Sequence, residues 1–101
     1  MSELYRLNGR IPVPCKDSEE WATWYGNHNR TVAKDEFGDA VISTVFLSIG
    51  HGFSSNDMPV LFETMVFGGE LDEEQDRYCT WEEAEAGHMA MVARVKQGLQ
   101  A

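Results

Sequence analysis

The fold is decided by the stretch YCTWEEAEAGHMAMVARVKQGL, residues 78–99, which predicts a long helix from about Thr80 to Gln97. Thr80 is suited to the N-cap, and Glu83 follows three residues later, the spacing of a capping box. Apolar residues and one histidine recur at helical spacing and form a stripe along one side. The stripe consists of Ala84, His88, Met91, Val92, Val95 and Leu99. A helix with one apolar face requires a second layer against which to bury it.

The residues before this helix predict that second layer. Residues 40–49, AVISTVFLSI, have apolar side chains at both odd and even positions, which is typical of a central strand. Gly38-Asp39 precedes them and predicts a tight hairpin turn from the strand before. Residues 59–67 predict the next strand, and residues 78–79 a short further one.

The N-terminal third adds a short helix. Residues 17–26 predict about two helical turns, with Asp17 as N-cap. Residues 4–14 contain two prolines and fit an edge strand or an extended arm. The order of elements predicts one α+β domain over residues 1–101. We expect an antiparallel sheet of three to five strands, with a short N-terminal helix and a long C-terminal helix packed on it.

The charge of the chain restricts its partners. The net charge is -9, from 17 acidic and 8 basic residues. Nucleic acid and anionic membranes attract basic proteins, so we expect no direct binding to either. A basic surface on another protein would attract this chain. No signal peptide or membrane-spanning run is visible, and Cys15 and Cys79 form no CxxC pair, so a cytoplasmic protein with reduced thiols is expected.

The acidic residues are concentrated in one part of the sequence. Residues 70–85 contain eight acids and one base, Arg77. The acids are Glu70, Asp72, Glu73, Glu74, Asp76, Glu82, Glu83 and Glu85. A solvated loop followed by an ordinary helix N-terminus would explain this composition. A patch that mimics nucleic-acid phosphates and binds a basic groove is the alternative, and its members would be Glu70, Asp72, Glu73, Glu74 and Asp76.

Three aromatic residues share one face of the short helix. Trp21, Trp24 and Tyr25 stand at positions i, i+3 and i+4. They can cover the core, or they can remain partly exposed and bind a partner. We include all three in the predicted partner-binding set.

Two histidines are candidates for a ligand site. His51 lies between two glycines after the strand of residues 40–49, and Glu63 lies in the next strand. A histidine beside carboxylates can hold a metal or act as a general base, although an exposed loop histidine explains the pattern as well. His88 lies on the apolar stripe, where it can be a core residue bonded to a backbone carbonyl or can face His51 or Glu63. The spacing matches no established metal motif, so we expect no metal.

Four segments of the chain together resemble a known family. They are YRLNGRIPVPC, STVFLSIGHGF, LFETMVFGGELDEE and YCTWEEAEAGH, in this order over most of the chain. The combination resembles a family of small uncharacterised proteins encoded by tailed bacteriophages and prophages. The resemblance implies a phage context, and hence the cytosol of a bacterial host, but no activity. The family pattern has an acidic residue before the histidine that matches His51, where this sequence has Gly50.

These observations lead to three hypotheses of function. Phage accessory proteins of this size often bind and inhibit host proteins, so we expect a non-enzymatic protein, without cofactor, that inhibits a basic host protein. A counter-defence role, such as inhibition of CRISPR, belongs to this class. A binder of nucleotide-like ligands is the first alternative, and a metal-dependent hydrolase with His51, Glu63 and His88 is the second. Phosphate-binding and hydrolase motifs are absent from the sequence, and homo-oligomerisation stays open.

Overall fold

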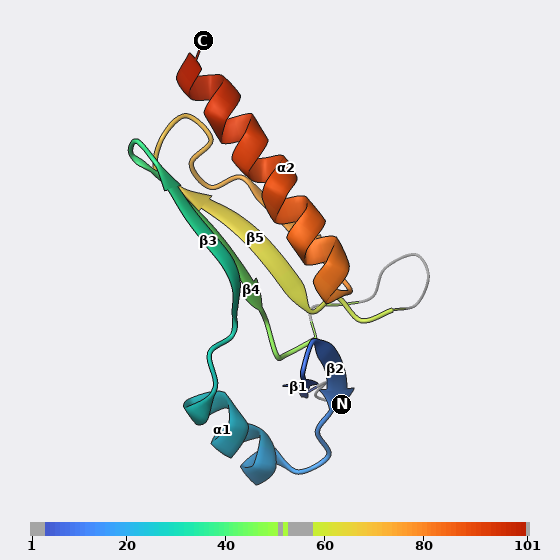
Figure 1. Cartoon of the computed structure of the whole chain (residues 1–101). Coiled ribbons are helices and arrows are strands. Elements are labelled where there is room, and N and C mark those ends of the chain that lie inside the picture. Colours follow the sequence, from blue (N-terminus) through green and yellow to red (C-terminus); the bar gives the residue numbers. More distant parts are fainter. Residues whose placement is uncertain (1–3, 51, 53–57, 101) are drawn as a thin grey trace.

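Helix α2 (Trp81–Gln100) lies along one face of a four-stranded antiparallel sheet in the computed structural model of the protein (Figure 1). The structure describes residues 4–50, 52 and 58–100. Each strand of the sheet pairs with the next strand along the chain, and α2 contacts all of them. The strands are β3 (Thr31–Phe37), β4 (Ala40–Phe46), β5 (Phe62–Phe67) and β6 (Gln75–Tyr78).

Strand β4 shows which face of the sheet is covered. Its side chains alternate between the two faces, as a period of two residues requires. Those on the α2 side are buried, namely Ala40, Ile42, Thr44 and Phe46. Those on the other side are half-buried, namely Val41, Ser43 and Val45. In the described part of the chain, α2 is the only element that forms a layer on this sheet (Figure 1).

Two sequence signals fix the ends of these elements as predicted. Gly38 and Asp39 connect β3 to β4, with Phe37 paired to Ala40, and Gly38 takes a φ of +58°, which favours glycine. At the start of α2, Thr80 Oγ1 accepts a hydrogen bond from Glu83 N at 3.1 Å, and Glu83 Oε1 accepts one from Thr80 N at 3.3 Å. This reciprocal pair is the predicted capping box.

The core between sheet and helix consists of two apolar clusters. The first contains Ala40, Ile42, Val66, Met91 and Val95. The second contains Phe46, Leu61, Phe62 and Ala84. Positions 44 on β4, 64 on β5 and 88 on α2 lie between the two clusters along their respective elements, and all three are buried polar residues. A polar layer therefore crosses the middle of the core.

The N-terminal segment lies at the end of the sheet where α2 begins (Figure 1). Strands β1 (Tyr5–Asn8) and β2 (Ile11–Pro14) form a separate hairpin, joined to the main body by hydrogen bonds such as Tyr5 N to the Ser48 carbonyl at 2.8 Å. Helix α1 (Ser18–Asn27) contacts β1, and Asp17 caps it by accepting a hydrogen bond from Glu19 N. Trp24 connects α1 to the core, because its ring meets that of Phe46 edge-on at 5.7 Å.

The α+β class, with an antiparallel sheet, a short N-terminal helix and a C-terminal helix packed on a sheet, is confirmed. Three boundaries differ from the predicted ones. The third strand of the sheet begins at Phe62 rather than residue 59, where Pro59 has no N–H to donate. The last strand precedes residue 79, and α2 continues through Gly98 to Gln100. Residues 4–14 form a two-stranded hairpin of their own, rather than a single edge strand or an extended arm.

A pair of methionines tests the packing of α2. Met91 is 1% exposed in the first cluster, whereas Met89 on the same helix is 72% exposed. Met91→Ala should lower the free energy of unfolding by about 2–5 kcal/mol, because it leaves a cavity. Met89→Ala is the control and should change it by less than about 0.5 kcal/mol. Urea denaturation measures both, and equal effects would show that the buried face of α2 is assigned incorrectly.

A pair of helical glycines tests the contact between α2 and β6. A Cβ added at Gly87 would overlap the ring of Tyr78, whereas one added at Gly26 in α1 would meet no atom within 4 Å. Alanine is more favourable than glycine inside a helix by about 1 kcal/mol, so Gly26→Ala should leave the melting temperature unchanged or raise it. Gly87→Ala should lower it, because α2 must move away from β6. An increase for Gly87→Ala would contradict this contact.

Candidate functional site

A chain of hydrogen-bonded side chains forms the polar layer under α2. His88 Nε2 lies 2.7 Å from Asp35 Oδ2 on β3, and His88 Nδ1 lies 2.7 Å from Thr44 Oγ1 on β4. Thr44 Oγ1 lies 2.5 Å from Thr64 Oγ1 on β5, which accepts a hydrogen bond from the Tyr78 hydroxyl at 3.2 Å. The chain thus joins all four strands of the sheet to α2.

When His88 is neutral, all of these side-chain hydrogen bonds can form if every donor points in the same direction, from Tyr78 toward Asp35. Tyr78 donates to Thr64, Thr64 to Thr44, Thr44 to His88 Nδ1, and the Nε2–H of His88 to the Asp35 carboxylate. Burial raises the pKa of the Tyr78 phenol above its ordinary value, so this first donor keeps its proton. Each buried hydroxyl then has both a donor and an acceptor.

The order carboxylate, imidazole, hydroxyl is also that of a nucleophilic triad. A nucleophile must be open to its substrate, however, and Thr44 and Thr64 are both fully buried, with 0% exposure. His88 has a side-chain exposure of only 4%, and the carboxylate of Asp35 is the exposed end of the chain. We therefore interpret this chain of hydrogen bonds as a structural element that positions α2, not as an active site.

The threonine pair provides a test of this interpretation. Thr44→Val alone leaves His88 Nδ1 without its donor, and Thr64→Val alone leaves the Tyr78 hydroxyl without its acceptor. Each should cost about 1–3 kcal/mol of unfolding free energy, because a buried polar group loses its partner. The double variant should cost less than the sum of the single variants, with a coupling energy of about 0.5–3 kcal/mol. Chemical denaturation of the four proteins measures the coupling, and strict additivity would contradict the bond between Thr44 and Thr64.

The predicted ligand residues do not come together. Glu63 and His88 lie on opposite faces of the sheet, because Glu63 precedes Thr64, which points toward α2. Glu63 instead accepts a hydrogen bond from Arg77 Nε on β6 at 2.9 Å. His51 lies outside the described residues. Among the described residues, no group of three or more His, Cys, Asp or Glu side chains is placed to hold a metal.

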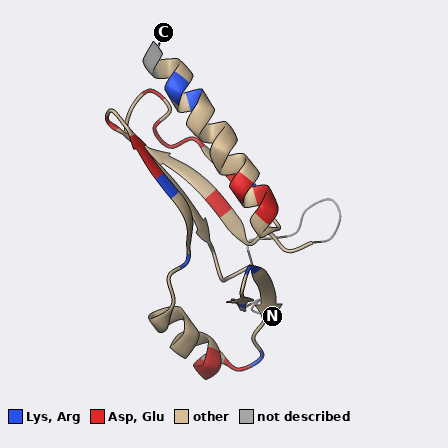
Figure 2. Cartoon of the chain, in the orientation of Figure 1, with Lys and Arg blue, Asp and Glu red and all other residues tan. Residues whose placement is uncertain are grey.

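The acidic run of residues 70–85 divides between the two ends of the molecule (Figure 2). Glu82, Glu83 and Glu85 lie in the first turns of α2, where Glu83 serves the capping box. Asp76 lies within β6, paired with Thr64 in the middle of the sheet, whereas Glu70, Asp72, Glu73 and Glu74 lie in the connection from β5 to β6, beside the C-terminal half of α2. This position follows from the 2.9 Å ion pair between Glu74 Oε1 and Arg94 on α2.

A further carboxylate joins the four residues of the connection in space. Gly68, at the start of the connection, packs so closely against the backbone carbonyl of Asp39 that a Cβ there would overlap it. The turn from β3 to β4 therefore lies beside the connection from β5 to β6. We define the acidic end as the five carboxylates of Asp39, Glu70, Asp72, Glu73 and Glu74. Sequence reasoning did not include Asp39, which is separated from the others by thirty or more positions.

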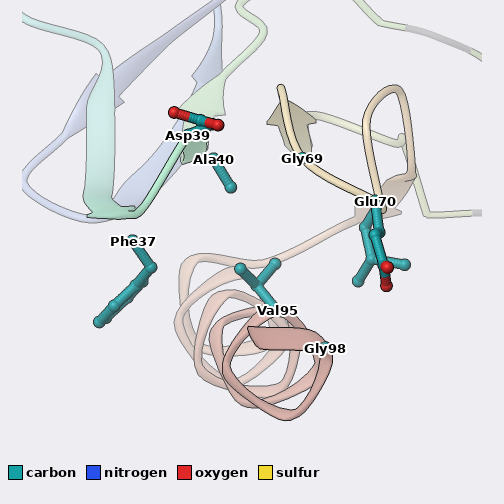
Figure 3. A pocket seen from close by; sticks show the side chains of 8 residues that line it. Phe37, Asp39, Ala40, Gly69, Glu70, Val95 and Gly98 are labelled. Carbon is teal, nitrogen blue, oxygen red and sulfur yellow. The ribbon is translucent and has the colours of Figure 1, made fainter. Parts of the chain in front are cut away.

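The acidic end contains a cleft of about 240 Å³ (Figure 3). Its walls include the apolar side chains of Phe37, Ala40, Leu71 and Val95, and the acidic residues Asp39 and Glu70 line it from two different loops. Phe37 is also covered by Lys96, whose Nζ lies 4.7 Å from the ring centroid. The cleft thus combines an apolar interior with negative charge, which suits a group that is both aliphatic and cationic.

The predicted aromatic residues lie at the other end of the molecule. Trp24 is partly buried against Phe46 and stacks on His28 at 5.2 Å, and Trp21 contacts Tyr25 at 4.9 Å. Tyr25 is the most exposed of the three predicted residues, and the Arg30 guanidinium lies 4.0 Å above its ring. The two halves of the predicted partner-binding set therefore cannot contact one small ligand together.

An open hollow of about 560 Å³ beside α1 is where a nucleotide-like ligand could stack on Trp24. Three carboxylates line it, namely those of Asp17, Glu19 and Glu20. Its one arginine, Arg6, lies 3.9 Å from the Glu20 carboxylate. Phosphate groups would be repelled by this excess of negative charge, so the hollow is unfavourable for a nucleotide.

Besides the cleft and the hollow, the protein has a groove of about 320 Å³. It was not predicted because its walls come from three separate segments. It lies between β2, residues 58–61 and the start of α2, and its lining includes Ile11, Pro12, Met58, Pro59, Leu61 and Trp81. Periodicity within one element gives no signal for such a site.

Comparison of the chain with known protein families, with curated proteins and with solved structures gave no match in any of the three. Neither helix in the described part of the chain has a stretch apolar enough to cross a membrane.

Proposed function

We propose that this protein is a non-enzymatic binding protein that docks on a basic surface of another protein through its acidic end. The observation that carries the proposal is the gathering of five carboxylates from two loops at one end of a chain of net charge -9, where two of these residues, Asp39 and Glu70, line an apolar cleft. Of the five, Glu74 pairs with Arg94 and Asp72 accepts a hydrogen bond from Gly68 N, whereas Asp39, Glu70 and Glu73 have no ion pair with a described residue. Their charge is available to a partner.

The chemistry of the cleft suits a lysine or arginine side chain. Such a side chain can lay its methylene groups against Ala40 and Val95 and keep its charged group beside Glu70. Exposed acids around the cleft would increase the association rate with a basic surface more than the final affinity. The same charge distribution would compete with nucleic acid for a basic groove.

The sequence resemblance to phage proteins gives this proposal a context. The partner would be a basic protein of the bacterial host, and binding would inhibit it by occupying the surface that it uses for nucleic acid. A nuclease of a defence system, CRISPR included, is a partner of this kind. The buried Thr44 and the separation of Glu63 from His88 favour binding over catalysis.

A matched pair of double variants tests the acidic end. Glu70→Gln with Glu73→Gln removes two charges from it, and Glu19→Gln with Glu82→Gln removes two charges from the opposite end. The immobilised proteins are exposed to bacterial lysate, and retained proteins are identified by mass spectrometry. The first double variant should lose the partner or bind it about tenfold more weakly, because charge complementarity is lost. The second should retain it.

Salt and heparin complete the test. Binding should weaken as salt rises, since exposed charges are screened over about 10 Å at 0.1 M ionic strength. Heparin, which also binds basic surfaces, should displace the protein from its partner. If the affinity for the partner is unchanged by salt, by heparin and by the substitutions of the first double variant, docking through the acidic end is contradicted. Thermal unfolding of both double variants checks that the fold is intact.

A further inference from the structure

The face of the sheet opposite α2 is apolar at its centre. In the paired rows of β4 and β5, Val41 lies opposite Phe67, and Ser43 opposite Met65. Val45 lies in the next row, opposite Glu63. Phe67 is 51% exposed, and none of the described elements other than the sheet itself covers these side chains. A sheet with one solvated face normally has polar residues on that face, so an apolar strip there indicates an interaction surface.

The charges around this strip balance. We define the open face as the residues of β3 to β6 that point away from α2: Thr31, Lys34, Glu36, Val41, Ser43, Val45, Glu63, Met65, Phe67, Gln75 and Arg77. It has two acids and two bases, although the whole chain has a net charge of -9. The excess negative charge thus lies elsewhere. Two copies would repel each other at their acidic ends but would meet no net repulsion at the open face.

We propose that two copies of this chain associate in solution through their open faces, sheet against sheet. An apolar centre with a charged rim is the usual composition of such an interface. A two-fold arrangement buries the same patch on both copies and gives the bases of one copy acids of the other with which to pair. The acidic ends and α2 stay exposed, so this association is independent of the proposed function.

The size of the face sets the strength of the association. Strands of about six residues at about 3.3 Å per residue, with strands about 4.8 Å apart, give a face of roughly 20 by 20 Å. Two such faces bury about 800 Å² in total, which is the size of a weak, transient interface, so the dimer should dissociate on dilution. Sedimentation equilibrium of the full chain, from low micromolar to near-millimolar concentration, should show a mass that rises from monomer to dimer.

Two methionines again provide matched variants. Met65→Lys places a charge at the centre of the open face, and Met89→Lys places the same charge on the exposed side of α2. Met65→Lys should raise the dimer dissociation constant by about tenfold or more, because the ammonium group would be buried without a partner. Met89→Lys should leave it unchanged. Phe67→Lys is a second variant on the open face, at an exposed position that tolerates charge in the monomer.

The outcomes separate the proposal from its alternatives. Circular dichroism and thermal unfolding must first show that each variant is folded. If Met65→Lys is not folded, the Phe67→Lys variant tests the proposal instead. A wild-type chain that stays monomeric at all concentrations would overturn the proposal and leave the open face to a different protein. A dimer that is weakened as much by Met89→Lys as by the open-face variants would overturn it as well.

Discussion

The hydrogen bonds of His88 hold the two layers of this protein in one relative position. The imidazole lies between two apolar clusters, whose contacts are less directional than its hydrogen bonds. A shift by one helical turn would separate His88 from Asp35 and Thr44 and leave buried polar groups unpaired, which costs more than an apolar mismatch. The polar layer therefore selects one register, and the apolar clusters supply most of the stability.

The position of α2 determines where the other features lie. With the helix in this register, Arg94 meets Glu74 and Val95 lines the cleft of the acidic end. The capped N-terminus of α2 lies at the opposite end, near the β1–β2 hairpin and α1. Because a single helix spans the sheet, the opposite face stays open and becomes available to a second copy. One constraint thus separates the acidic end, which we propose binds a basic partner, from the neutral open face with its apolar centre, through which we propose self-association.

The sequence predicted the elements better than the contacts between them. The capping box at Thr80, the turn at Gly38 and the stripe of α2 depend on residues within a few positions of one another, so local patterns were sufficient. His88 was correctly placed in the core, but its partners are side chains 44 and 53 positions away rather than a backbone carbonyl. The acidic run was treated as one region, yet β6 carries the chain back along the sheet and divides it. Asp39 joins the acidic end only through the close approach of Gly68.

The protonation of the His88 ring tests this anchoring most directly. NMR spectra that correlate the imidazole nitrogens with the ring protons distinguish which nitrogen carries the hydrogen in the neutral form. The hydrogen-bonded chain predicts hydrogen on Nε2, which donates to Asp35, and a bare Nδ1, which accepts from Thr44. Hydrogen on Nδ1 would place the lone pair of Nε2 against the Asp35 carboxylate and would contradict this arrangement of hydrogen bonds. A ring that samples both neutral forms, as free histidine does, would contradict it as well.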